Sequence, residues 1–233
     1  CLLTTWLQNT QAAEPMSRGY TISTLDLSRQ KHRQAIVDRE KGQYLGHPTT
    51  VLLEDGHTML IVYPKGHGKG GIVYKRSEDG GNTWSERLPT PKSWSTSREV
   101  PTIHRVVDSK GKKRLIMWSG LYPARLAVSE DDGANWSELK QVGDWGGIVV
   151  MGCLEGMRKD KGHYMAMFHD DGRFFSSNPK QKKPVVFDLF KTFSKDGGLT
   201  WTQPESILAR SDVHLCEPGI IRSPDGKQLC VLL

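Results

Sequence analysis

The chain has 233 residues, enough for one large domain or two small ones. Hydrophobic residues make up 36% of it and include seven Trp, so a sizeable core is possible. Mean hydropathy is −0.50, and no apolar run has the length needed to cross a bilayer, so we predict no membrane span. The net charge of +6 comes from scattered basic residues, and the densest cluster, at 178–184, is typical of a solvated loop rather than a nucleic-acid site.

The N-terminal residues, CLLTTWLQNTQAAEP, differ from the rest of the chain. A short apolar start followed by small residues is typical of the end of a secretory signal peptide, the alternative being an irregular N-terminus. We therefore predict a signal-peptide remnant at 1–13, a folded domain at 20–233, and a secreted or periplasmic protein.

Short segments rich in β-branched and aromatic residues then follow one another, and none has a helical period. An early strand is expected at 34–38. The main predicted strands form three groups of three: 49–55, 57–64 and 71–77; 101–108, 114–120 and 124–130; 147–155, 163–170 and 185–194. A fourth strand, such as 86–90 or 138–142, is expected after a group.

One motif, Ser-x-Asp-x-Gly-x-(Thr/Asn)-Trp, follows each group of three predicted strands. Asp bonds its own backbone in turns, Gly supplies a positive φ, and Trp offers a large apolar surface. The motif therefore predicts a tight turn between the third and fourth strands. Its members are Ser77, Asp79, Gly81, Thr83 and Trp84; Ser129, Asp131, Gly133, Asn135 and Trp136; and Ser194, Asp196, Gly198, Thr200 and Trp201.

The spacing of the motif indicates the architecture. Asp79 and Asp131 are 52 residues apart, and Asp131 and Asp196 are 65 apart. A four-stranded unit repeated at this length is typical of a propeller blade. We predict an all-β chain from a six-bladed β-propeller, with about three and a half blades present and the fourth truncated within 216–233.

The repeated motif on four-stranded units resembles the Asp-box, or BNR repeat, of the sialidase (neuraminidase) superfamily. The resemblance covers about residues 40–233 and suggests the N-terminal fragment of a divergent member. It implies that the motif is structural and lies on the face away from the active site. It also implies that the active-site face carries an Arg trio, an Asp acid/base, a Tyr nucleophile and a Glu that activates the Tyr.

The family's functional residues match this sequence only in part. Gly46 stands where the family has its first Arg, and His47 replaces Ile before Pro48. The loop that would hold a second Arg and the Asp has neither. The Tyr would lie beyond Leu233. The resemblance therefore suggests a Glu that assists the Tyr, histidines as acid or base, and lysines as anion-binding groups: Glu217, His67 and His47 as catalytic residues, Lys65 and Lys69 as substrate-binding residues.

Further candidates come from the residues themselves. His104 and Arg105 alternate on a predicted strand, so one of them lines the channel or both are surface positions. The stretch FHDDGRF contains His169, Asp170 and Arg173, which form either an Asp-Gly hairpin or a carboxylate acid/base with a cation. Glu99 is interpreted as a polar loop residue.

The sequence thus predicts a sialidase-like glycoside hydrolase acting on glycans with acidic sugars. The alternatives are a propeller that binds carbohydrate without cleaving it and a propeller used for protein contacts. Motifs of nucleotide-binding and metal-dependent enzymes are missing, and the four cysteines fit no zinc pattern. We therefore expect no cofactor, no metal and no nucleic-acid partner.

Overall fold

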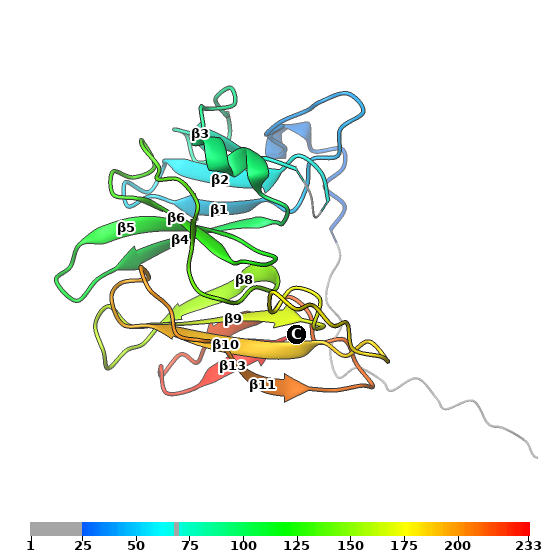
Figure 1. Ribbon diagram of the computed structural model, residues 1–233. Helices are drawn as coiled ribbons and strands as arrows, with labels where there is room; N and C mark the ends of the chain where they lie inside the picture. Colours follow the sequence, from blue (N-terminus) through cyan, green and yellow to red (C-terminus); the bar gives the residue numbers. More distant parts are fainter. Residues whose placement is uncertain (1–24, 68–69) are drawn as a thin grey trace, which may run out of the picture. The chain divides into compact units, whose positions relative to one another are not determined.

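The computed structural model describes residues 25–67 and 70–233, and its regular structure is almost entirely β (Figure 1). These residues form thirteen strands and two short 3₁₀ helices, η1 (Lys31–Arg33) and η2 (Lys92–Thr96), and contain no α-helix. Ala35–Leu233 make up one compact unit, and residues 25–34 belong to another. The predicted signal-peptide remnant lies outside the described residues.

The strands form four antiparallel sheets, and in each sheet the strands follow chain order. Sheet 1 has three strands, sheets 2 and 3 have four each, and sheet 4 has two. Sheet 1 contains β1 (Thr49–Leu52), β2 (Met59–Pro64) and β3 (Ile72–Ser77); sheet 2 contains β4 (Pro101–Val107), β5 (Lys113–Ser119), β6 (Arg125–Ser129) and β7 (Lys140–Gln141).

Sheet 3 contains β8 (Ile148–Gly156), β9 (Tyr164–Asp170), β10 (Asp188–Ser194) and β11 (Glu205–Ala209), and sheet 4 contains β12 (Gly219–Arg222) and β13 (Leu229–Leu232). All nine strands of the three predicted groups are present. Residues 86–90 form no regular strand, although Leu88 N donates to Tyr74 O at 2.9 Å and keeps this segment beside β3. Residues 34–38 are not a strand either.

The first strand of each sheet lies against the first strand of the next, so that β1 contacts β4, β4 contacts β8 and β8 contacts β12. Thr49 Oγ1 donates to Pro101 O at 3.1 Å, and Met151 N donates to Thr102 Oγ1 at 3.0 Å. Successive four-stranded sheets joined along their inner strands are the arrangement of propeller blades. The predicted all-β propeller fold is confirmed, while the count of six blades remains a prediction.

Each copy of the repeated motif forms the same hydrogen-bonded turn after the third strand of its sheet. In the first copy, Ser77 Oγ accepts from Gly81 N at 2.8 Å, and Asp79 Oδ1 accepts from Thr83 N at 2.8 Å. The corresponding bonds are both 2.9 Å in the second copy and both 2.9 Å in the third. The three turns are therefore one structure built three times, as the sequence predicts.

The second and third turns pack against the sheet before them. Tyr74 Oη of sheet 1 donates to Gly133 O at 2.8 Å, and a Cβ at Gly133 would lie 2.5 Å from Tyr74 Oη. A Cβ at Gly198 would lie 3.1 Å from the Ile116 side chain of sheet 2. Glycine is thus required for close approach as well as for its positive φ.

The core is divided among the interfaces between successive sheets. Sheets 1 and 2 share a cluster that includes Leu60, Trp94 and Met117, and sheets 2 and 3 share a cluster of larger rings. In the second cluster, the Trp118 and Trp201 ring centroids are 5.3 Å apart. Burial of apolar surface between blades, rather than within them, therefore holds the sheets in sequence.

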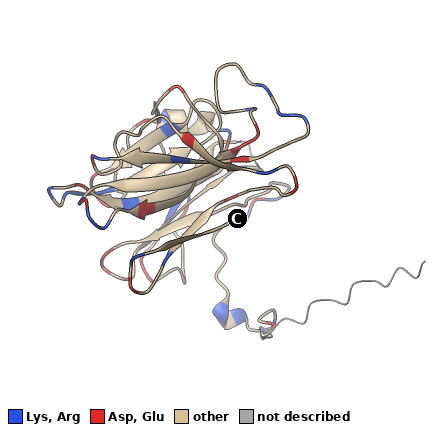
Figure 2. Cartoon of the chain, turned by 90° about the horizontal axis from the view of Figure 1, so that it is seen from below, with Lys and Arg blue, Asp and Glu red and all other residues tan. Residues whose placement is uncertain are grey.

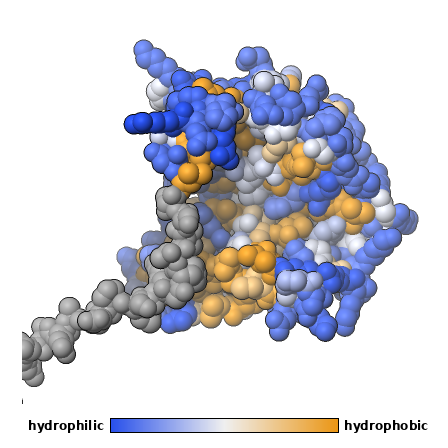
Figure 3. Space-filling view, turned by 180° about the vertical axis from the view of Figure 1, so that it is seen from behind, coloured by the Kyte–Doolittle hydropathy of each residue, from blue (hydrophilic) through white to orange (hydrophobic). Residues whose placement is uncertain are grey.

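One face of sheet 4 is exposed and apolar. Ile221 and Leu232 are 56% and 55% exposed, whereas their strand neighbours Ile220 and Val231 pack against sheet 3. Hydrophobic surface is visible in the lower part of Figure 3, on the side where β12 and β13 lie. In Figure 2, Lys and Arg are interspersed with Asp and Glu instead of gathering in one patch. No helix among the described residues is long and apolar enough to span a membrane.

The three motif tryptophans should contribute unequally to stability. Trp201 is 8% exposed and packs on sheet 2, whereas Trp84 is half-buried. We expect Trp201→Ala to lower the free energy of unfolding by about 3–5 kcal/mol, and Trp84→Ala by clearly less, as measured by urea denaturation. Equal losses for the two variants would contradict the packing described.

Candidate functional site

Strand direction places the predicted site residues and the repeated turns at opposite ends of the sheets. In an antiparallel sheet, the entrance to the first strand and the loop between the second and third strands lie at the same end. His47, Glu99 and Glu217 precede β1, β4 and β12, while His67 and Asp171 lie in loops between second and third strands. The repeated turns follow the third strands, so they lie at the other end.

Two histidines from sheet 1 face each other. His47 comes from the entrance to β1, His67 comes from the β2–β3 loop, and their ring centroids are 4.5 Å apart. The Tyr44 ring lies 6.2 Å from the first and 6.0 Å from the second. His47 Nε2 is buried and has no hydrogen-bond partner among the described residues. The structure therefore brings the two predicted catalytic histidines together.

A buried carboxyl group lies at the same end of the sheets as this pair. Glu99 is only 6% exposed, and its Oε1 accepts from Val100 N at 2.7 Å. Burial raises the pKa of Glu99 and the charge of Glu217 raises it further, while His47 and His67 lower it. Residues from three sheets thus act on one carboxyl group, which is not the polar loop residue that the sequence suggested.

The backbone around Glu99 leaves no spare room. A Cβ at Gly120 would lie 2.9 Å from Glu99 Cγ, 3.1 Å from Gly147 O and 3.1 Å from Val150 N. Glycine at position 120 therefore lets the chain of sheet 2 pass directly behind the Glu99 side chain. We call the group of His47, His67, Glu99 and Glu217 the Glu99 cluster.

Glu217 is exposed, and a buried histidine holds its backbone. Glu217 N donates to His169 Nδ1 at 3.1 Å, so this nitrogen carries no proton. Burial lowers the pKa of His169, which is 3% exposed, and nearby carboxylates oppose the shift. The ring of Phe187 lies between His169 and His214, with centroids 5.2 and 5.0 Å away. His169 therefore acts on Glu217 as a neutral positioning residue.

Three residues at the entrances to inner strands have left-handed backbone conformations. The φ angles are 51° at His47, 50° at Val149 and 49° at Glu217. Such angles are uncommon outside glycine and cost of order 1–3 kcal/mol when the surroundings impose them. Two of the three residues belong to the Glu99 cluster, so the backbone strain and the candidate site coincide.

Asp170 and Asp171 organise the β9–β10 loop, which runs from Asp171 to Phe187 and is not the short Asp-Gly hairpin considered from sequence. Asp170 Oδ2 accepts from Gly172 N at 2.6 Å, while Oδ1 is buried without a partner among the described residues. Burial raises the pKa of Asp170 to about 6. Asp171 accepts from Arg173 Nε at 2.8 Å, so the charge of Arg173 is already paired.

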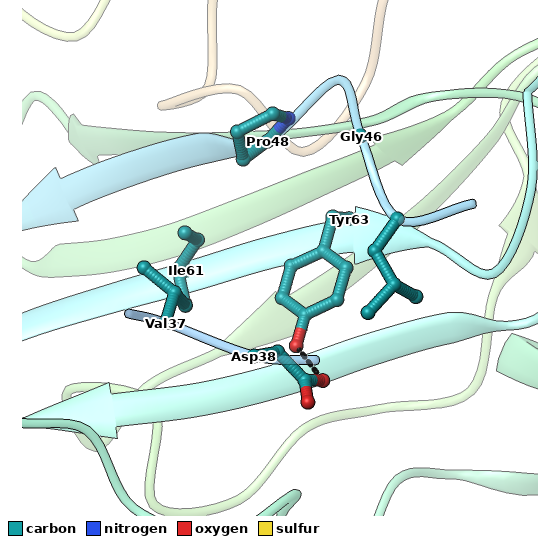
Figure 4. A pocket seen from close by; sticks show the side chains of 7 residues that line it. Val37, Asp38, Gly46, Pro48, Ile61 and Tyr63 are labelled. Atoms are coloured by element: carbon teal, nitrogen blue, oxygen red, sulfur yellow. Dashed lines mark hydrogen bonds between the residues drawn. The ribbon is translucent and has the colours of Figure 1, made fainter. Parts of the chain in front are cut away.

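Lys65 is also paired, through a segment that packs on sheet 1. Lys65 Nζ lies 3.0 Å from Glu40 Oε2, and Arg87 binds the same carboxylate at 2.6 Å. Asp38 accepts from Tyr63 Oη and from Arg87 Nε beside a cavity of about 110 Å³ (Figure 4). Although burial opposes it, these hydrogen bonds lower the pKa of Asp38 to about 2. Lys69 lies outside the described residues.

Gly46, which stands at the family's first Arg position, lines the same cavity. A Cβ at Gly46 would lie 2.5 Å from Tyr44 Oη. Any side chain at this position would therefore have to displace the Tyr44 ring.

His104 and Arg105 point to opposite sides of β4, as predicted. Arg105 Nη2 donates to Leu52 O of sheet 1, whereas His104 shares its side of the strand with Thr102, which accepts from sheet 3. Burial lowers the pKa of His104 to about 4, and its Nε2 has no partner among the described residues. Neither residue is among the charged groups that act on Glu99.

A pocket that no sequence pattern predicted lies next to the Glu99 cluster. It has a volume of about 400 Å³, and its lining comes from the segment before β4 and from the β5–β6 loop: Thr96, Arg98, Gly120, Leu121, Tyr122, Pro123 and Arg125. The two arginines are 27 positions apart and belong to no motif. The only sequence feature that pointed to this pocket is that Arg98 directly precedes Glu99 at the entrance to a predicted strand.

Within residues 25–67 and 70–233, no group of three His, Cys, Asp or Glu side chains is placed to hold a metal ion. Cys153, Cys216 and Cys230 are free thiols, and Cys230 is exposed. The chemistry available in the Glu99 cluster is therefore that of carboxyl and imidazole groups.

No family model and no curated protein matches this sequence. Among solved structures, the chain resembles a protein of unknown function from Dyadobacter fermentans with a TM-score of 0.56 and 14% identity, over 82% of this chain and 62% of that one. An endo-arabinase from Bacteroides thetaiotaomicron has a TM-score of 0.47 and 11% identity, over 79% and 68%. For the GH43B protein of a Bacteroides ovatus xyloglucan PUL, the TM-score is 0.43 and the identity is 17%, over 79% of this chain and 34% of that one. At these identities the likeness concerns the fold alone, and the chain spans less than two thirds of the first protein.

Burial of Asp170 should make stability depend on pH. Because its pKa is about 6 in the folded protein and 3.8 ordinarily, its ionisation costs nothing below pH 4 and its full cost applies above pH 6. Asp170→Asn removes this cost. We therefore expect the difference in free energy of unfolding, variant minus parent, to rise by at most about 3 kcal/mol from pH 4 to pH 7. Urea unfolding of both proteins at pH 4 and at pH 7 measures this difference. A difference independent of pH would contradict this.

The space behind Glu99 can be tested with one methyl group. Gly120→Ala places its Cβ against Glu99 and two backbone atoms, so we expect a loss of about 1–3 kcal/mol in the free energy of unfolding. Gly219→Ala in β12 is the matched control, because a Cβ there meets nothing within 4 Å. Similar behaviour of the two variants would show that Glu99 is not confined by Gly120.

Proposed function

We propose that this protein is a sialidase-like glycoside hydrolase that acts on glycans containing acidic sugars. The observation that carries the proposal is the Glu99 carboxyl group, which is buried at the same end of the sheets as His47, His67 and Glu217, opposite the repeated turns. A pair of carboxyl groups in unlike surroundings is the usual equipment for breaking a glycosidic bond. The three repeated turns support membership of the sialidase superfamily, and the export-like N-terminus supports secretion.

Glu99 has the properties of a proton donor. Burial disfavours its ionised form, so its carboxyl group retains a proton to higher pH than an ordinary glutamic acid. A neutral carboxyl group next to the scissile bond can protonate the departing sugar oxygen. In this proposal Glu99 supplies that proton.

Glu217 has a different environment and a different role. Its side chain is exposed, and its backbone is fixed by His169 in a left-handed conformation. In this proposal its carboxylate activates the attacking group on the sugar face away from Glu99. The family resemblance assigns the same residue to activation of a Tyr nucleophile, which agrees with a base at this position.

The two histidines complete the site. His47 and His67 are in mutual contact and lower the pKa of Glu99, which keeps this group within the range where it can give up its proton. A histidine also exchanges protons near neutral pH. In this proposal the proton that the attacking group gives up returns to Glu99 through the pair, so that the acid is restored after each turnover.

The second candidate is a propeller that binds acidic glycans without cleaving them. Gly46 replaces the first family Arg, and the space for a side chain there is occupied by Tyr44. Lys65, which could have replaced an arginine, is paired with Glu40. These observations weaken the family's own way of gripping a substrate carboxylate, and they leave binding by other groups open.

The test is turnover by Glu99→Gln on a sialoside and on a panel of glucuronides and galacturonides. Glutamine keeps the size of the side chain but donates no acidic proton, so we expect kcat to fall about 10²–10⁴-fold with little change in glycan affinity. Glu78→Gln, an exposed carboxylate in the first repeated turn, is the matched control and should retain full activity.

Thermal melting of both variants checks that folding is intact. Hydrolysis by Glu99→Gln at the parent rate would remove Glu99 as the proton donor. Binding of an acidic glycan with no turnover by the parent protein on any substrate of the panel would favour the non-catalytic propeller.

A further inference from the structure

Two arginines that belong to no motif line one pocket beside the Glu99 cluster. Arg98 comes from the segment before β4 and Arg125 from the start of β6, and the pocket between them has a volume of about 400 Å³. The pocket opens at the same end of the sheets as the Glu99 cluster, because it is built from a strand entrance and the β5–β6 loop. Its position therefore makes it accessible to a glycan bound at that end.

The two guanidinium groups have no carboxylate partner within 4 Å among the described residues. Arg125 is held by Thr96 alone, with Nη1 donating to Oγ1 at 2.8 Å and Nη2 to the carbonyl oxygen at 3.0 Å. Burial lowers the pKa of Arg125, and the like charge of Arg98 lowers it further. An anion in the pocket would relieve both effects.

An acidic residue near the pocket already has a partner. Tyr122 Oη donates to Asp144, and this contact raises the pKa of Tyr122. Asp144 is bonded to Tyr122 and, among the described residues, forms no ion pair with Arg98 or Arg125. The pocket lining contains two guanidinium groups and no carboxylate.

The pocket and the Glu99 cluster are neighbours but distinct. Gly120 lines the pocket on one side and lies against Glu99 Cγ on the other. The charged groups that act on the Glu99 carboxyl are His47, His67 and Glu217, and neither pocket arginine is among them. A group bound between the arginines is thus separated from Glu99 by the backbone of Gly120.

We propose that this pocket is an anion subsite, which binds a carboxylate or sulfate group on a sugar adjoining the one that Glu99 acts on. The inference rests on the proposed function and extends it: the protein selects an acidic chain, not only an acidic terminal sugar. Guanidinium groups suit such oxyanions because they donate two parallel hydrogen bonds. Leu121, Tyr122 and Pro123 add an apolar wall for the face of a sugar ring.

The test is isothermal titration calorimetry with three trisaccharides. The first is trigalacturonate, which carries carboxylates; the second is an otherwise uncharged trisaccharide that carries sulfate; the third is the second without its sulfate. We expect at least one charged ligand to bind about tenfold or more tightly than the neutral one. The tighter of the two charged ligands identifies the anion as carboxylate or sulfate.

Arginine variants assign the selectivity to the pocket. Arg98→Gln removes an exposed side chain with no recorded role in folding, and we expect it to reduce the preference for the charged ligand about tenfold. Arg125→Gln should do the same if its fold is intact. Arg158→Gln in the β8–β9 turn is the matched control, since it removes a guanidinium group from the opposite end of the sheets.

Three results would overturn the subsite: equal affinity for charged and neutral ligands, no binding of any ligand, or an undiminished preference in Arg98→Gln. The outcome is separable from that of the proposed hydrolysis. Arginine-dependent binding without turnover would refute catalysis and leave the subsite standing. Turnover whose rate depends neither on Arg98 nor on a charge on the adjoining sugar would refute the subsite and leave the proposed hydrolysis standing.

Discussion

The contact between a repeated turn and the sheet before it is the constraint on which the rest of the structure depends. Gly133 lies against Tyr74, and Gly198 lies against Val106 and Ile116, because neither glycine has a Cβ. The Ser and Asp of each motif satisfy the backbone of the turn from within, so that the turn can pack as a rigid body. The blades are thereby joined at one end of the sheets.

Stability at one end leaves the other end free to carry strain and buried charge. His47 and Glu217 have left-handed backbones there, and Glu99 and Asp170 are carboxyl groups with little exposure. Each of these features is unfavourable by itself and persists because the surrounding sheets enforce it. Strand direction alone places the repeated turns and the candidate site residues at opposite ends of the sheets, because each motif follows a third strand.

Local patterns were sufficient to predict the nine main strands and the three turns, but they also suggested strands at 34–38 and 86–90 that do not form. The family resemblance, not a local pattern, indicated which end of the sheets carries the candidate site. The resemblance also pointed to His47, His67 and Glu217, which the structure places at that end, while their catalytic roles remain predictions. Burial could not be predicted: Glu99 has the local sequence of a loop residue, and only the packing of Gly120 behind it makes it a core residue. Ion pairs could not be predicted either, since Lys65 pairs with Glu40, which lies in a segment with no regular structure. The Arg98 and Arg125 pocket arises from two distant loops, and no spacing rule connects them.

Burial raises the pKa of the Glu99 carboxyl group above that of an ordinary glutamic acid. Its titration by ¹³C NMR, with the resonance assigned by comparison with Glu99→Gln, measures this directly. The structure predicts a midpoint above the ordinary value of 4.5, because burial outweighs the two histidines. A midpoint at or below 4.5 would mean that Glu99 is ionised at working pH and cannot be the proton donor.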